Sequence, residues 1–154
     1  MFDNALYTAE QSKKIDQFII NHVKINGLDL MSKAAFACFF EIQKELCGRI
    51  TVVCGMGNNA GDGLMLAAIC HMSGMKVTVY LCNSVERLTP DSRYMFDHAE
   101  SIGVDIKQIE NIDDSFIGSL SSSDIVVDAI FGTGVNRDIH GVLEMVINSI
   151  NQYS

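Results

Sequence analysis

Short apolar runs alternate along the chain with longer segments in which apolar residues recur at helical spacing. Four runs are apolar on nearly successive residues and rich in valine and isoleucine, which is typical of strands buried on both faces. They cover residues 50–54, 75–82, 104–109 and 125–130. The segments with helical spacing predict helices over residues 8–27, 29–47, 64–73, 89–103 and 139–151. Strands that alternate with helices in this way predict an α/β fold with a parallel sheet covered on both faces.

Local signals refine these elements. Thr8 and Gln11 have the spacing of a capping box, so they predict the start of the first helix. The second helix is predicted to bury one apolar stripe, made of Leu30, Ala34, Ala37, Cys38, Ile42 and Leu46. The polar stretch Ser119–Ser123 predicts a loop, because serine side chains compete for backbone hydrogen bonds.

Two glycine-rich loops directly follow predicted strands. One spans Gly55–Gly63, after the strand 50–54, and the other spans Gly132–Gly134, after the strand 125–130. In open parallel sheets, ligands bind beyond the carboxyl ends of the strands. We therefore expect both loops at one edge of the sheet, as a binding site.

The first loop partly matches a dinucleotide fingerprint, as Gly55-x-Gly57-x-x-Ala60. The second strand, however, ends without the acid that would hold a ribose hydroxyl, and Asp62 inside the loop would repel a phosphate. No Gly-Lys-Ser/Thr follows, so a P-loop is excluded. The alternative is that the segment is only a long turn that leads into a helix.

The oxygen-bearing side chains of this loop predict a cation site. Asn58, Asn59 and Asp62 supply oxygens, and Asp128 ends the fourth strand at the same edge. Oxygen ligands with little total charge favour a monovalent ion over Mg²⁺. Because Asp62 lies close to a helix start, we also expect its carboxylate to stay ionised and to be a poor acid.

The second loop, Gly132-Thr133-Gly134, exposes backbone N–H groups and one hydroxyl, which suit a phosphate or a carboxamide. Its alternative is a plain turn between a strand and the next element.

Composition narrows the function classes. With 11 Lys+Arg against 19 Asp+Glu, the net charge is −8, which disfavours binding to nucleic acid or to anionic lipid. No apolar run approaches the ~18 residues of a membrane span, and Asp3 stands where a secretory signal would be basic. The five cysteines include no C-x-x-C pair, so we expect reduced core residues. These features predict a cytoplasmic, single-domain protein over residues 1–154.

The two loop sequences resemble the two signatures of a known family. These are Asn58-Asn59-Ala60-Gly61-Asp62-Gly63 and Asp128-Ala129-Ile130-Phe131-Gly132-Thr133-Gly134. They are similar to the YjeF N-terminal domain, the family of NAD(P)H-hydrate epimerases. The lead-in segments Leu6–Gln11 and Leu30–Ala34 are also similar, and the resemblance covers nearly the whole chain in order.

This resemblance implies a Rossmann-like, three-layer α/β/α fold with a mostly parallel sheet and two N-terminal helices. It implies epimerisation at C6 of hydrated NADH and NADPH, called NADHX and NADPHX, so that a partner NAD(P)H-hydrate dehydratase can repair the S form. Asn59 and Asp128 would bind K⁺. The substrate contacts would be Asn58, Asn59, Ala60, Gly61, Asp62, Gly132, Thr133, Gly134, Val135, Asn136, Arg137 and Asp138.

One departure from the family bears on activity. In the family a further strand ends in a motif like Asp-Ile-Pro-Ser-Gly, whose Asp is the expected acid–base group and whose Ser helps to bind K⁺. The 154 residues stop before such a motif, so we expect a truncated fold with little epimerase activity of its own. Two other readings stay open: a noncatalytic binding or scaffold module, as in an mRNA-decapping scaffold, and an unrelated nucleotide-dependent enzyme. The oligomeric state is also open, a homodimer included.

Overall fold

A computed structural model describes residues 7–23, 26–45, 48–135 and 138–153. Its elements are, in order, α1 (Ala9–Phe18), the π-helical turn η1 (Ile19–Val23), α2 (Gly27–Ile42), β1 (Arg49–Cys54), α3 (Asn58–Met72), β2 (Lys76–Leu81), the 3₁₀ helix η2 (Val85–Arg87), α4 (Pro90–Ser101), β3 (Asp105–Gln108), α5 (Asp114–Ser122), β4 (Ile125–Ala129) and α6 (Val142–Tyr153). None of the described helices is long and apolar enough to cross a membrane.

The four strands form one sheet in the order β3-β2-β1-β4, and every pair is parallel. In this register Val53 of β1 lies opposite Tyr80 of β2 and Asp128 of β4. The parallel sheet predicted from the four apolar runs is therefore confirmed. Because β1 is central, the strand ends of β2 and β4 flank the loop that follows β1.

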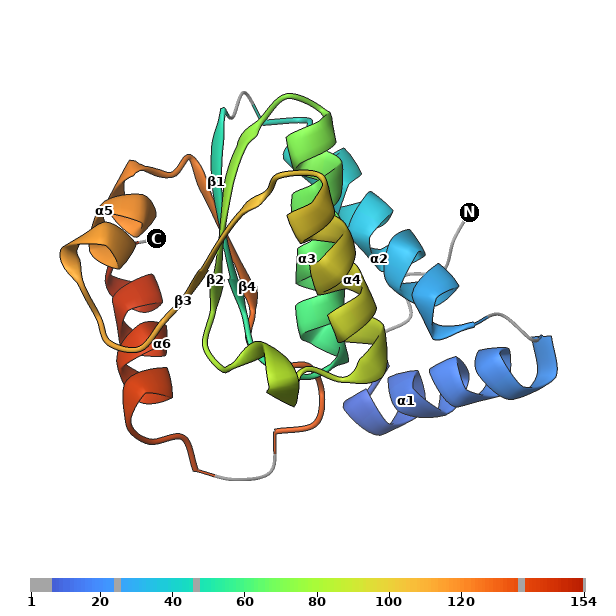
Figure 1. Cartoon of the computed structure of the whole chain (residues 1–154). Helices are drawn as coiled ribbons and strands as arrows, with labels where there is room; N and C mark the ends of the chain where they lie inside the picture. The colour runs from blue at the N-terminus through green and yellow to red at the C-terminus, as the bar shows by residue number, and fades with distance from the viewer. Residues whose placement is uncertain (1–6, 24–25, 46–47, 136–137, 154) are drawn as a thin grey trace.

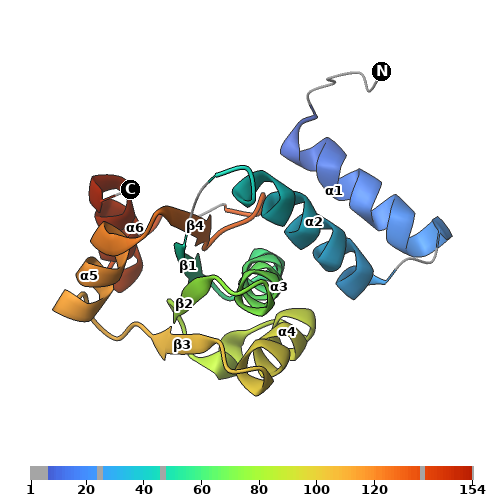
Figure 2. The ribbon, with the colours of Figure 1, turned by 90° about the horizontal axis from the view of Figure 1, so that it is seen from above.

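Helices cover both faces of the sheet, which confirms the α/β/α layers (Figure 1). Seen from above, α2, α3 and α4 lie on one side of the sheet, and α5 and α6 lie on the other (Figure 2). Each face has its own core. Val52 and Cys54 face the α3 side, whereas Val53 faces the side of α5 and α6 with Phe116 and Val146. This alternation along β1 is what buries successive apolar residues on both faces.

The buried stripe of α2 differs from the predicted one. The side chains buried against α3 and the sheet are Met31, Ala35, Phe39 and Ile42, so of the predicted stripe Ile42 is right and Ala34, Ala37 and Cys38 are exposed. Leu30 is half-buried, and Leu46 lies outside the described residues. The physical reason is that α2 is apolar around most of its circumference, with Phe36 and Phe40 exposed as well. Spacing alone could not decide which stripe faces the core.

The first helix begins as predicted but does not pack as an amphipathic helix should. The Thr8–Gln11 capping box is present, with both reciprocal hydrogen bonds. Yet α1 has no buried residue, and Ile15 and Phe18 are exposed. Figure 2 shows why: α1 lies outside α2, away from the sheet.

The serine-rich segment predicted as a loop is helical. Ser119 to Ser122 belong to α5, which the sequence pattern did not indicate. The serine hydroxyls are used within the fold: Ser119 bonds the Tyr80 hydroxyl at 2.7 Å, and Ser123 donates to the Ser119 carbonyl at 2.8 Å. The burial of Phe116 and Leu120 against the sheet holds this short helix in place despite its weak propensity.

Candidate functional site

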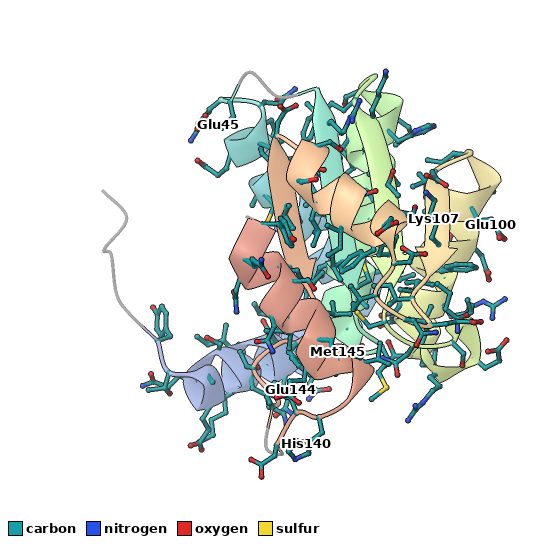
Figure 3. The ribbon with its side chains drawn as sticks, turned by 90° about the vertical axis from the view of Figure 1, so that its left-hand side faces the viewer. Glu45, Glu100, Lys107, His140, Glu144 and Met145 are labelled. Carbon is teal, nitrogen blue, oxygen red and sulfur yellow. The ribbon has the colours of Figure 1, made fainter. Side chains whose placement is uncertain are left out.

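The loops that follow β1 and β4 meet at the carboxyl edge of the sheet, as predicted. The Gly55 N–H donates to the Ala129 carbonyl at 3.1 Å, which extends the pairing of β1 and β4 to their ends. Figure 3 shows which end of the molecule carries this edge. Glu45 lies at the end where β1 begins, and His140 and Glu144 lie at the opposite end, where the segment after β4 leads into α6.

The first loop is shorter than the sequence suggested, because α3 begins at Asn58 rather than at Leu64. Two of its glycines serve close packing in a helix instead of a turn. A Cβ on Gly63 would lie 2.5 Å from the Ala129 Cβ, and one on Gly61 would lie 2.5 Å from the Met31 sulfur. These contacts let the first turns of α3 press against the sheet and α2. Asn58 to Asp62 are thus held on a rigid element.

Asn58 and Asn59 tie the start of α3 to two neighbouring connections. The Asn59 Nδ2 donates to the Phe131 carbonyl at 2.8 Å, so the first signature contacts the second directly. The Thr89 hydroxyl donates to the Asn58 Oδ1 at 2.9 Å. The side chains therefore fix the helix start between the loop after β4 and the start of α4.

Thr89 and Ser92 were missed as contributors to this site. The Ser92 hydroxyl donates to the Gly57 carbonyl at 2.8 Å, and the Thr89 N–H donates to the Met56 carbonyl at 3.1 Å. The sequence showed Thr89-Pro90 as a helix start, which is correct. No local pattern could show that this helix start would also support the residues after β1.

Asp128 lies at the end of β4, on the face covered by α5 and α6, since its partner Val53 belongs to that core. One of its carboxylate oxygens accepts a hydrogen bond from the Ile130 N–H at 2.9 Å. Asn59 comes instead from α3, on the other face, and reaches the same segment at Phe131. The two predicted cation ligands thus both bond to the stretch that follows β4.

The chemistry of these groups fits a monovalent cation. The Asn59 amide donates through its nitrogen, and among the described residues no hydrogen bond is made to its oxygen, which can face a ligand. Asp128 would add one negative charge. The described residues contain no group of three or more His, Cys, Asp or Glu that could hold a metal ion. A cation here would depend on amide and carbonyl oxygens, as K⁺ can; its binding stays a prediction.

The remaining predicted contact residues fall into three sets. Ala60 and Gly61 are buried as whole residues, and the Ala60 N–H already donates to the Gly57 carbonyl at 3.0 Å. Gly132, Thr133, Gly134 and Val135 are exposed, as is Asp138. Asn136 and Arg137 lie outside the described residues.

Asp62 departs from the expectation that it would be firmly ionised. Burial, and secondarily the negative charge of Asp16 on α1, raise the pKa of the Asp62 carboxyl to about 6 from its ordinary 3.8. The helix start does not outweigh these effects. The expectation is corrected in degree: the carboxyl is still mainly ionised at pH 7, but it is half protonated near pH 6 and is a better acid than an ordinary aspartate side chain.

The raised pKa of Asp62 predicts a pH-dependent stability. The folded protein binds a proton more tightly than the unfolded chain, so stability is lost as pH rises from about 3.8 to about 6. The full shift corresponds to about 3 kcal/mol, reduced to about 1–2 kcal/mol by partial exposure. We expect Asp62→Asn to raise the free energy of unfolding by that amount at pH 7 and by nothing at pH 3.5. Urea unfolding at both pH values tests this, and an equal effect at both would contradict it.

The comparisons with known proteins agree with this architecture. A family model described as "YjeF-related protein N-terminus" matches residues 27–154. The chain belongs to this family. An "NAD(P)H-hydrate epimerase" from Oenococcus oeni is 33% identical over 147 residues, covering 94% of this chain and 67% of that protein. One from Anaerococcus prevotii is 32% identical over 142 residues, covering 91% of this chain and 65% of that protein.

A solved structure supports the fold of this YjeF-family chain. The crystal structure of the yeast protein ynu0, YNL200c, superposes with a TM-score of 0.85 at 18% identity, over 97% of this chain and 65% of that one. The chain thus spans about two thirds of the length of the relatives it matches.

Proposed function

We propose that this protein is an NAD(P)H-hydrate epimerase, an isomerase that interconverts the R and S forms of NADHX and NADPHX. The observation that carries the proposal is the 2.8 Å hydrogen bond from Asn59 to the Phe131 carbonyl, which joins the two family signatures in one site. Relatives of this name at about 32% identity support the same reaction class. The product would serve nicotinamide nucleotide repair, with an NAD(P)H-hydrate dehydratase acting on the S form.

In this proposal the residues at the carboxyl edge of the sheet have distinct roles. Backbone N–H groups of Gly132 to Gly134 would hold the nucleotide, since these residues are exposed beyond the end of β4, next to the start of α3. Asn59 and Asp128 would hold K⁺, which supplies positive charge beside the substrate.

Asp62 would move the proton. Epimerisation at C6 requires either that the hydroxyl leaves and returns or an equivalent ring opening, and both need a proton donor and acceptor near that carbon. A half-buried carboxyl with a pKa of about 6 can take both roles near neutral pH. Its position four residues after Asn58 and three after Asn59 places it on the same side of α3 as these side chains.

A noncatalytic binding module is the second candidate, since members of one fold often differ in activity. The oxygen ligands and the raised pKa of Asp62 favour the enzyme, because a scaffold requires neither. An unrelated NAD-dependent oxidoreductase is disfavoured, since the second strand ends without the acid that such enzymes use to hold the ribose 2′-hydroxyl.

The test is to follow the conversion of R-NADHX to S-NADHX by chromatography, with and without K⁺. We expect interconversion that depends on both the protein and K⁺, and replacement of K⁺ by Na⁺ should slow it. Binding of NADHX without any interconversion would support the binding module instead.

A further inference from the structure

The end of β2 has no role in the proposed reaction so far, although it lies at the same edge of the sheet. After β2 ends at Leu81, the chain passes through Cys82 and Asn83 into η2 (Val85–Arg87). Figure 1 shows this short helix at the end of the sheet where α3 begins. In the sheet order, β2 lies on the opposite side of β1 from β4.

The size of the substrate makes this position relevant. NADHX and NADPHX are dinucleotides, and the proposed reaction site lies between β1 and β4, at Asn59 and Asp62. Neighbouring strands are about 4.8 Å apart, so the ends of β4 and β2 are separated by about 10 Å. A dinucleotide is longer than this distance. A substrate with its nicotinamide half beside β4 can therefore reach the end of β2 with its adenosine half. In doubly wound sheets the adenosine ribose is read at the end of the second strand.

The side chains at the end of β2 suit a phosphate on that ribose. Asn83 stands where an acid would hold a free 2′-hydroxyl and would repel a 2′-phosphate. Its amide oxygen accepts a hydrogen bond from Arg87 Nη1 at 3.4 Å. Arg87 is exposed, and its guanidinium can form paired hydrogen bonds with phosphate oxygens. A neutral amide orients the arginine without neutralising it.

The neighbouring charges leave Arg87 available. Among the described residues Arg87 makes no salt bridge, whereas Arg93 pairs with Asp97 at 2.8 Å. The adjacent carboxylate of Glu86 accepts hydrogen bonds from its own backbone and from Ser84, and these, with Arg93 nearby, hold its pKa below the ordinary value. Glu86 thus stays ionised, and its hydrogen bonds are made within its own turn and not to Arg87.

We propose that Arg87, oriented by Asn83, binds the 2′-phosphate of NADPHX, so that the site prefers NADPHX to NADHX. This inference rests on the proposed function for the presence of the nucleotide, and it adds the substrate preference.

The experiment compares the binding of two stable probes by calorimetry, 2′-phospho-ADP-ribose and ADP-ribose. They differ by the 2′-phosphate alone and require no turnover. We expect the unmodified protein to bind the phosphorylated probe about tenfold to hundredfold more tightly, the effect of one charged hydrogen-bonding pair. Arg87→Gln should abolish this preference and leave the affinity for ADP-ribose unchanged. Asn83→Asp should lower the affinity for the phosphorylated probe and not for ADP-ribose, because the new carboxylate repels the phosphate.

Lys76→Gln is the matched control. It removes one exposed positive charge at the start of β2, at the opposite edge of the sheet, so it should preserve the preference. Circular dichroism checks that each variant is folded. Equal affinity of the unmodified protein for both probes would overturn the inference. So would an Arg87→Gln protein that loses affinity for both probes by the same factor.

The epimerase assay separates the two possible failures. Interconversion of NADHX and NADPHX with equal kcat/KM would refute the 2′-phosphate subsite and leave the proposed function standing. If neither probe binds and neither substrate is interconverted, both proposals fail.

Discussion

Replacing Asp62 by asparagine should lower the rate of NADHX epimerisation by about 10²–10⁴-fold, the usual effect of losing a general acid–base group. Asparagine keeps the size of the side chain and cannot exchange a proton. Asp62 is suited to this role by its environment, because burial and the charge of Asp16 bring the pKa of its carboxyl to about 6. The measurement is kcat for interconversion of R- and S-NADHX over the pH range 5 to 8.

Asp16→Asn is the matched control for this prediction. Like Asp62→Asn, it removes one carboxylate, here from α1. It should lower the pKa of Asp62, because the negative charge that helps to raise that pKa is gone. We expect its maximal rate to stay close to that of the unmodified protein. The limb of the pH profile that depends on protonated Asp62 should move to lower pH. If Asp62→Asn turns over at the full rate, the proton comes from another group of this chain, and the role proposed for Asp62 is wrong.

Replacing Gly55 by alanine should destabilise the fold by about 3 kcal/mol or more, a large part of the total stability of a typical domain. A Cβ at this position would lie 2.0 Å from the Ile130 carbonyl oxygen and 2.9 Å from its carbonyl carbon. These are backbone atoms, so no side chain can rotate away. The ends of β1 and β4 would have to separate, and the hydrogen bond from Gly55 to Ala129 would be lost.

Gly118 provides the control for the glycine experiment. It lies on the exposed side of α5, and a Cβ there would meet no atom within 4 Å. Gly118→Ala should therefore stabilise the protein by about 0.5–1 kcal/mol through helix propensity. The midpoint and slope of urea unfolding distinguish the two variants. A Gly55→Ala protein as stable as the unmodified one would show that the two strand ends are not held this closely.

The sheet was predictable because each strand has its own signal. Val52 and Val53 follow one another on a strand buried on both faces, and four such short runs separated by helical segments indicate a parallel sheet. The buried face of α2 was not predictable, because both Ala34 and Ala35 fit an apolar stripe. Only packing against α3 decides between them. Helix α5 was missed because its serines resemble loop residues, and the burial of Phe116 that stabilises it depends on the finished sheet.

For the site, the residue types were predictable and their environments were not. The signatures placed Asn59 and Phe131 in one site, and the structure joins them by a hydrogen bond. The glycines of the first signature indicate a turn by sequence, whereas in the structure Gly61 and Gly63 bring a helix close to its neighbours. The pKa of Asp62 depends on Asp16, which is 46 positions earlier in the chain. No local pattern carries that information.

The two asparagines at the start of α3 should differ in how their positions covary with their hydrogen-bond partners among related sequences. Asn59 bonds to a backbone carbonyl, which every residue type has, so position 131 can change its side chain without loss of that bond. Asn58 accepts its hydrogen bond from the hydroxyl of Thr89, which few residue types can replace. Substitutions at 58 and 89 should therefore occur together across related sequences, whereas the side chain at 131 should vary without any matching change at 59.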